Sequence, residues 1–351
     1  MKKEKKTPIR TAVVGFGLSG RVFHTPFVDR HPDFELHTIV TSGIEAGKVY
    51  PSARIIRSFE EMLGDSSIDL VVLATPHPMH YAQAMAALEA GKHVIIEKPV
   101  TMSSKDMQKI GDRSMACGKN VFPYHNRRWD GDFMTLQQII REGRLGEVLD
   151  FESHFDRYQP AVSRAEWRYT QAEGGGTMYD LGPHLIDQAI CLFGKPQGVW
   201  CRLHFQREGS LANDSFDLKL FYQKTTATLQ ASVFVRETGP RFQVHGTLGS
   251  YVKYGLDIQE AALKKGKKPD TAGFGWESRR MFGVLNSVAG KEPLKIKYPT
   301  LPGHYMGFYE DVLASLRENK AQKVSVEDAI LNLEIIEAAI LSHNQKSVIN
   351  L

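Results

Sequence analysis

Residues 11–20 read Thr-Ala-Val-Val-Gly-Phe-Gly-Leu-Ser-Gly, an apolar run that leads directly into Gly15-x-Gly17-x-x-Gly20. These glycines suit a turn from a buried strand into a helix. Gly15 allows the backbone angles of the turn, Gly17 leaves the main chain open to a pyrophosphate, and Gly20 lets the helix pack closely on the strand. The N–H groups at the start of that helix would hold the anion. The pattern therefore predicts a dinucleotide site.

Strands and helices alternate over the first third of the chain. Apolar strands are predicted at 11–14, 36–40, 70–74, 93–96 and 121–124, with helices at 80–90 and 104–116 among them. Continuous apolar strands separated by helices are typical of a parallel sheet that is covered on both faces. We therefore predict an α/β, doubly wound Rossmann domain over residues 1–125.

The pattern changes after residue 125. Helices are predicted at 132–141 and 176–193, and strands at 148–158, 199–206, 216–222, 226–234 and 242–254. Consecutive strands with few helices between them indicate an open, mainly antiparallel sheet. Ser325-x-x-Asp328 resembles a capping box and predicts a final helix that ends near residue 341. Residues 126–351 are therefore predicted to form an α+β second domain.

The composition excludes several classes of protein. The chain has 351 residues, of which 42% are hydrophobic and 24% charged, as in ordinary globular proteins. It has no basic stripe with interleaved aromatic residues, no apolar run of membrane length and no signal-peptide core, so we expect neither nucleic-acid binding nor membrane insertion. Its three cysteines form no C-x-x-C pair, which indicates reduced thiols in the cytoplasm and no metal cluster.

Glu97-Lys98-Pro99 follows the predicted strand at 93–96. Ligands of open α/β sheets lie beyond the carboxyl ends of the strands, so Lys98 is expected to point toward a bound cofactor. The alternative is an ordinary surface lysine at a strand end. Pro99 restricts the chain at this point and is compatible with a cis peptide bond.

A second cluster of polar residues lies in the glycine-rich stretch 174–187. Asp180 and His184 are four residues apart, so they share one face of a helix. A carboxylate beside an imidazole makes a tunable proton donor and acceptor. Two other readings stay open on spacing alone: a metal pair, although a third ligand at matching spacing is missing, and a helix cap with a structural histidine.

The end of the second strand bears on the choice of cofactor. An acidic residue there would bind both ribose hydroxyls and repel a 2′-phosphate. Residues 39–43 instead carry the hydroxyls of Thr41 and Ser42, and Lys48 adds a positive charge nearby. NADP(H) is therefore favoured, and NAD(H) remains possible.

In their order and separation, the three motifs 15–20, 97–99 and 174–187 resemble the glucose-fructose oxidoreductase/inositol dehydrogenase/MocA (Gfo/Idh/MocA) family over almost the whole chain. Residues 126–130 and 249–257 resemble the branch that contains NADP-dependent scyllo-inositol dehydrogenases. The resemblance implies a second domain that binds substrate and forms a homodimer or homotetramer through its open sheet. It also implies hydride transfer between nicotinamide C4 and a secondary alcohol or ketone carbon of a cyclic polyol or sugar.

The resemblance assigns Lys98, Asp180 and His184 to catalysis, with His184 as the proton carrier. The residues expected to bind the cofactor are Gly15, Phe16, Gly17, Leu18, Ser19, Gly20, Thr41, Ser42, Thr75, Pro76, His77, His80, Glu97, Lys98, Asn126, Trp167 and Arg168. The candidates for the substrate pocket are Arg157, Tyr158, Lys253, Asp257, His304 and Tyr305.

The sequence departs from the family pattern at His77, where many members have asparagine; we interpret this as a changed local contact. His24 also belongs to the resemblance but is read as a packed structural histidine. The Trp167–Arg168 pair fits either a place near the nicotinamide or a surface stack.

Two alternative functions remain. The same fold and mechanism serve other substrates, such as diols or biliverdin-type pigments. A protein that binds NADP as a sensor without turnover is also possible, because a fold does not fix a function. The retention of Lys98, Asp180 and His184 together argues against a pure sensor.

Overall fold

The computed structural model describes residues 7–161, 174–290 and 292–351. The chain divides into two compact units. The first comprises the chain up to Asn126 together with Gln259–Phe274 and His304–Ile330. The second comprises Arg127–Ile258, Gly275–Gly303 and Leu331–Leu351. Two segments that lie downstream of residue 125 therefore pack with the N-terminal part of the chain.

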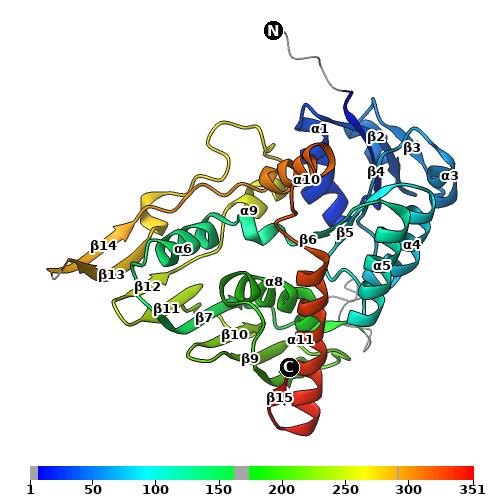
Figure 1. The fold of residues 1–351 in the computed structure, drawn as a ribbon. Helices are drawn as coiled ribbons and strands as arrows, with labels where there is room; N and C mark the ends of the chain where they lie inside the picture. Colours follow the sequence, from blue (N-terminus) through cyan, green and yellow to red (C-terminus); the bar gives the residue numbers. More distant parts are fainter. Residues whose placement is uncertain (1–6, 162–173, 291) are drawn as a thin grey trace. The chain divides into compact units, whose positions relative to one another are not determined.

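The first unit contains a six-stranded parallel sheet in the order β3-β2-β1-β4-β5-β6 (Figure 1). Its strands are β1 (Ile9–Val14), β2 (Phe34–Val40), β3 (Arg54–Ile56), β4 (Leu70–Leu73), β5 (His93–Glu97) and β6 (Val121–Tyr124). The side chains of β4 are all buried, as expected for a strand covered on both faces. The predicted doubly wound fold is confirmed, and β3 is a strand that the sequence analysis did not predict.

The helices of this unit follow the predicted pattern with additions. They are η1 (Gly20–His24, a π-helical turn), α1 (Thr25–Arg30), α2 (Glu45–Val49), α3 (Phe59–Gly64), η2 (His77–Met79), α4 (His80–Glu89), α5 (Ser104–Cys117), α9 (Gln259–Lys264) and α10 (Met306–Glu318). Helices α4 and α5 lie side by side in Figure 1. The α10 helix was not predicted, and it buries Phe308, Tyr309 and Val312.

The second unit contains a nine-stranded sheet in the order β14-β13-β12-β11-β7-β10-β9-β8-β15. Its strands are β7 (Val148–Asp156), β8 (Gly198–His204), β9 (Ser215–Phe221), β10 (Thr226–Ser232), β11 (Phe242–Gly246), β12 (Ser250–Lys253), β13 (Gly283–Ala289), β14 (Glu292–Tyr298) and β15 (Ile349–Asn350). All neighbouring pairs are antiparallel except β7 with β10, so the sheet is mixed but mainly antiparallel, as predicted.

The single strand predicted over 242–254 is wrong in one respect. The chain reverses at residues 247–249, where Gly246 donates to the carbonyl of Gly249 at 2.9 Å, and β11 and β12 pair antiparallel. The hairpin β13–β14 was not predicted.

The remaining helical elements are η3 (Asn126–Trp129), α6 (Gly131–Arg141), α8 (Gly176–Phe193), η4 (Arg279–Met281) and α11 (Val326–Gln345). The predicted capping box is confirmed at the start of α11. Asp328 N–H donates to the Ser325 hydroxyl at 3.0 Å, and Ser325 N–H donates to the Asp328 carboxylate at 3.3 Å.

Helix α8 packs against β7, β9 and β10 and covers one face of the second sheet. The covered face is apolar, with Phe151, Leu218 and Leu229 fully buried. The opposite face carries half-buried polar side chains, such as His154 and Gln230, which are partners in the register of β7 and β10. Side chains on this face are therefore partly accessible to solvent.

Candidate functional site

The glycine turn after β1 shows why three glycines are needed. A Cβ on Gly15, whose φ is +96°, would lie 2.6 Å from the carbonyl oxygen of Ala74, and a Cβ on Gly20 would lie 2.0 Å from that of Gly15. A Cβ on Gly17 would meet no atom within 4 Å. The outer glycines are therefore required by the packing of the chain itself. The middle one leaves open backbone where a pyrophosphate can approach, so the turn fits a dinucleotide.

The ends of three strands bring the other predicted residues to the same edge of the sheet. Val14 is in register with Leu73, which is in register with Ile96. The glycine turn, the loop after β4 and Lys98 after β5 therefore emerge at one carboxyl edge, which is where open α/β sheets bind ligands. The Lys98–Pro99 peptide is cis, as the sequence allowed.

His80 joins two loops at this edge. Its Nδ1 lies 3.0 Å from the carbonyl oxygen of Pro99, and its Nε2 lies 2.9 Å from that of Thr75. Burial lowers the pKa of His80, and the two backbone carbonyls oppose that shift. The Thr75 hydroxyl donates to Gln83 at 2.6 Å. These bonds give His80 and Thr75 a supporting role in the loops; their contact with a cofactor stays a prediction.

Glu97 is a buried carboxylate surrounded by donors. Its Oε1 accepts from the Ser19 hydroxyl and lies 3.1 Å from His24 Nε2, and its Oε2 accepts from the N–H of Lys98 at 2.9 Å. Burial acts to raise the pKa of Glu97, but the hydrogen bond and charge of His24, together with the Ser19 bond, lower it to about 2. The carboxylate is therefore ionised and holds the glycine turn directly.

The end of β2 carries one charged pair that the sequence analysis missed. Arg21 from η1 lies 4.0 Å from the Glu45 carboxylate of α2. The Thr41 hydroxyl accepts from Gly43 N–H at 3.2 Å, and Ser42 is exposed. Residues 39–43 contain no carboxylate, as stated above, but Glu45 brings one close, already paired with an arginine. The signal available was that Arg21 directly follows the last glycine and therefore lies in the first turn of the helical element that begins there.

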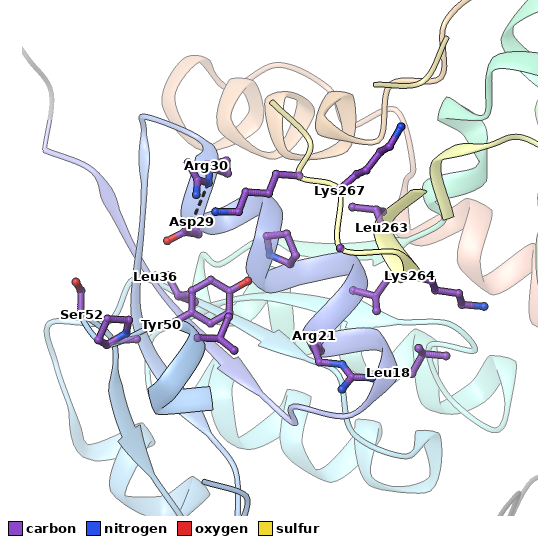
Figure 2. Close-up of a pocket in the computed structure, with 17 residues that line it drawn as sticks. Leu18, Arg21, Asp29, Arg30, Leu36, Tyr50, Ser52, Leu263, Lys264 and Lys267 are labelled. Atoms are coloured by element: carbon purple, nitrogen blue, oxygen red, sulfur yellow. Dashed lines mark ion pairs between the residues drawn. The ribbon is translucent and has the colours of Figure 1, made fainter. Parts of the chain in front are cut away.

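A pocket with a volume of about 580 Å³ opens beside the glycine turn, within the first unit (Figure 2). Its walls come from η1 and α1, from residues 49–53 and from the α9 region. Figure 2 shows the side chains of Lys264 and Lys267 directed away from Tyr50, and Arg30 paired with Asp29 at 3.2 Å. Of the predicted site residues that the structure describes, only Leu18 lines this pocket.

Helix α8 in the second unit carries both Asp180 and His184. Asn213 fixes its start, because its carbonyl accepts from Thr177 N–H and its side-chain oxygen accepts from Met178 N–H, both at 2.8 Å. A Cβ on Gly176 would lie 2.5 Å from the Asn213 carbonyl oxygen. The space beside this glycine is therefore filled by Asn213.

Several contacts fix the orientation of α8 and its side chains. Arg128 binds Asp187 through two hydrogen bonds of 2.9 and 2.7 Å, which ties η3 to the helix. The buried ring of His184 lies 6.4 Å from that of Phe155 in an edge-to-face arrangement. The Asp180 carboxylate lies 4.0 Å from Arg157. Lys98 belongs to the first unit and α8 to the second, so the convergence of the catalytic set stays a prediction.

The substrate candidates divide between the units. Lys253 is fully buried, and its ammonium donates to Glu277 at 3.1 Å and to the Tyr254 carbonyl at 2.9 Å. Asp257 accepts from Gly131 N–H at 2.8 Å, at the start of α6. These bonds hold both side chains in place in the second unit; their contact with a substrate stays a prediction.

The other candidates differ in exposure. Tyr158 is exposed, with the Arg236 guanidinium 4.1 Å from its ring centre. In the first unit, His304 lies 2.9 Å from Glu310, and Tyr305 is fully buried. Asn126 and His77 are also buried. Trp167 and Arg168 lie outside the described residues.

The described ranges contain neither a metal centre nor a helix that could span a membrane. Within residues 7–161, 174–290 and 292–351, no group of three or more His, Cys, Asp or Glu side chains is arranged to hold a metal ion. None of the helices in that part of the chain has the length and apolar character needed to span a membrane.

The chain is similar to known proteins along its whole length. Residues 9–125 match the oxidoreductase family's NAD-binding Rossmann fold, and residues 137–351 match that family's C-terminal alpha/beta domain. The chain is 37% identical to scyllo-inositol 2-dehydrogenase (NADP(+)) IolW of Bacillus subtilis, covering 99% of this chain and 98% of the relative. It is 38% identical to the uncharacterized oxidoreductase YdgJ of Escherichia coli, covering 97% and 98%.

Solved structures agree with these matches. The chain superimposes on the yvaA oxidoreductase structure from Bacillus subtilis with a TM-score of 0.95 and 37% identity, covering 99% of this chain and all of the other. The fold, the glycine turn and these matches define an oxidoreductase with an NAD-binding Rossmann domain. The chain belongs to the Gfo/Idh/MocA family.

Proposed function

We propose that the protein is an NADP(H)-dependent oxidoreductase that transfers a hydride between nicotinamide C4 and a secondary alcohol or ketone carbon of a cyclic polyol or sugar. The observation that carries this proposal is the open backbone at Gly17 on the same sheet edge as Lys98. The named activity of the B. subtilis relative, an NADP-dependent inositol dehydrogenase, supports the substrate class.

The end of β2 supports the choice of NADP(H). Thr41 and Ser42 offer hydroxyls, and Arg21 offers a guanidinium whose partner, Glu45, is 4.0 Å away and exposed. A 2′-phosphate carries more charge than a carboxylate and would compete well for this arginine. Because Glu45 also lies near, binding of NAD(H) remains compatible with the site.

The protein's own residues divide the chemistry as follows. A bound nicotinamide supplies the position that accepts or gives the hydride. Lys98 donates a hydrogen bond to the reacting oxygen and stabilises its developing negative charge during oxidation. His184 takes the hydroxyl proton and Asp180 orients it, as the helical spacing allows. Lysine supplies the electrostatic stabilisation that other dehydrogenases take from a metal ion.

Partners and compartment are part of the same proposal. The open polar face of the second sheet is the surface through which we expect a homodimer or homotetramer to form. Cys117, Cys191 and Cys201 form no disulfide bond among the described residues, which suits the reducing cytoplasm. Light scattering of the purified protein measures the oligomer directly.

The experiment that tests the function is a substrate panel. NADPH or NADH is mixed with the protein and with inososes, ketoses, diol-derived ketones or biliverdin, and the loss of nicotinamide absorbance is followed. Turnover of inososes or ketoses that is absent in Lys98→Met supports the proposal. Turnover of only the other compounds identifies another substrate. Tight NADPH binding without turnover identifies a sensor.

A further inference from the structure

A chain of buried side chains connects α10 to the glycine turn within the first unit. The Tyr309 hydroxyl lies 2.8 Å from Nδ1 of His24, and Nε2 of His24 lies 3.1 Å from Oε1 of Glu97. The same carboxylate accepts from the Ser19 hydroxyl and from Lys98 N–H. One carboxylate therefore joins the expected cofactor turn to the backbone of the expected catalytic lysine, and its support comes from a helix more than 200 residues away in sequence.

The surroundings leave these groups little freedom. His24 and Tyr309 are fully buried, and Glu97 is 7% exposed. The Tyr309 ring is stacked on Phe27 with centroids 6.0 Å apart, and the His24 ring lies 4.2 Å from that of Tyr124. A buried carboxylate is stable only while its donors remain in place. Each ring nitrogen of His24 therefore has one partner, the Tyr309 hydroxyl at Nδ1 and the Glu97 carboxylate at Nε2.

We propose that Tyr309 and His24 are positioning residues, which hold the Glu97 carboxylate so that the glycine turn and Lys98 keep a fixed geometry. The inference rests on the proposed function, because it takes residues 15–20 as the cofactor turn. Both residues act through Glu97. Loss of the Tyr309 hydroxyl should therefore alter cofactor affinity through Ser19 and turnover through Lys98.

The test is a double-mutant cycle on the affinity for NADPH, measured from its fluorescence with the full-length protein. Tyr309→Phe removes only the hydroxyl and keeps the stacked ring. We expect Tyr309→Phe and Ser19→Ala each to weaken NADPH binding about three- to tenfold, the range for one hydrogen bond. In the Ser19→Ala background, Tyr309→Phe should have little further effect on affinity, because the connection is already cut. It should still lower turnover at saturating NADPH.

Tyr222→Phe is the matched control, since its hydroxyl is buried in the second unit and has no hydrogen-bond partner among the described residues. When Tyr222→Phe is combined with Ser19→Ala, the fold-change in NADPH affinity should equal the product of the two single fold-changes. If Tyr309→Phe fails to fold, His24→Gln cuts the same connection and takes its place.

Two results would overturn the inference and leave Tyr309 merely structural. In the first, the fold-change in NADPH affinity of the double variant equals the product of the fold-changes of Tyr309→Phe and Ser19→Ala. In the second, Tyr309→Phe lowers the melting temperature and leaves NADPH affinity unchanged. The binding assay needs no substrate. A wild-type protein that binds NADPH and shows the coupling, but turns over no polyol, therefore counts against the proposed substrate alone. A wild-type protein that binds neither NADPH nor NADH overturns both.

Discussion

Among single residues, Lys98 is the one at which a substitution separates a catalytic role from a structural role most directly. Lys98→Met keeps the length and apolar stem of the side chain but removes its charge and its donors. We expect hydride transfer to slow by orders of magnitude and the melting temperature to change little, because a lysine at a strand end adds little to a core. Single-turnover kinetics and thermal unfolding on the same preparation check this. An unstable variant with full activity would contradict the assignment.

His184 is predicted to carry the proton. His184→Ala should reduce turnover by roughly 10²–10⁴-fold, the usual contribution of a positioned acid or base, and leave NADPH affinity nearly unchanged. Asp180→Asn should have a similar or smaller effect, because it alters the orientation of the imidazole without removing it. Steady-state kinetics with an NADPH titration measure both. Near-normal turnover in His184→Ala would make this histidine structural.

The end of β2 is predicted to set the cofactor preference. An aspartate at Thr41 or Ser42 would face the 2′-phosphate and cost about 1–3 kcal/mol of NADPH binding if the phosphate contact is charge-assisted. NADH binding should hold or improve. Ser42→Asn is the control, since it has similar size without the charge. Titration of each protein with NADPH and with NADH measures the two affinities. A wild-type protein that prefers NADH would refute the assignment before any substitution is made.

At the level of elements, the glycine turn yields a paired prediction. Gly20→Ala places a Cβ 2.0 Å from the Gly15 carbonyl oxygen, so the turn must distort and the melting temperature should fall. Gly17→Ala meets no protein atom within 4 Å, so the fold should persist. Its methyl group should nevertheless obstruct the pyrophosphate and weaken NADPH binding. Melting curves and NADPH titrations on both variants test the pair. A Gly17→Ala protein with unchanged NADPH affinity would place the pyrophosphate elsewhere.

Strand β5 begins with a histidine that links stability to pH. Burial and, secondarily, the charge of Lys119 lower the pKa of His93 to about 4, and its Nδ1 accepts from Asn120 N–H at 3.0 Å. Because the folded pKa lies below the unfolded value near 6.5, the folded state keeps this histidine neutral. The stability that this provides is present above about pH 6.5 and is lost as the pH falls toward 4.

The loss from this one group is up to roughly 3 kcal/mol, at 1.36 kcal/mol per pKa unit. Urea unfolding at pH 7 and pH 4.5 measures it, with His93→Gln as the control that can still accept from Asn120. The variant should lose less stability than the wild type over this interval. Equal losses would assign the acid sensitivity to other groups.

The elements that the sequence predicted are those with a strong local signal. The parallel strands are continuous apolar runs, and α5 and α8 begin within a residue of their predicted starts. By contrast, β3 has three residues, of which only Ile56 is buried, and β14 is largely exposed, so neither has an apolar pattern to find. The division of 242–254 into β11 and β12 depends on the backbone turn at 247–249, which hydrophobicity alone does not reveal.

In the candidate site, too, the sequence predicted the features of short motifs and missed the contacts between distant residues. The glycine turn and the residues after β5 were found because their chemistry is local to a short motif. The bonds of Lys253 to Glu277 and of Tyr309 to His24 join residues 24 and 285 positions apart, and no spacing rule predicts them. The pairing of Arg21 with Glu45 depends likewise on the tertiary arrangement of η1 and α2.

For the molecule as a whole, the two compact units do not follow a single cut in the sequence. Residues 259–274 and 304–330 pack with the N-terminal unit, although the chain has by then built most of the second sheet. Each returning segment is tied down by specific contacts. Arg30 pairs with Asp270 at 3.4 Å, and Asn120 donates to Ser315 at 3.3 Å. Local sequence patterns carry no information on this return, since it depends on tertiary contacts alone.

The return of α10 bears on how the protein is made. When the ribosome has released Asn126, all six strands of the first sheet exist, but the helix that carries Tyr309 has not been synthesised. At about 5–20 residues per second, the roughly 200 residues that follow take some 10–40 s. During this interval the nascent N-terminal third exposes apolar surface that α10 later covers, and we expect chaperones to bind it. A gene fragment that stops at residue 126 therefore encodes an incomplete folding unit.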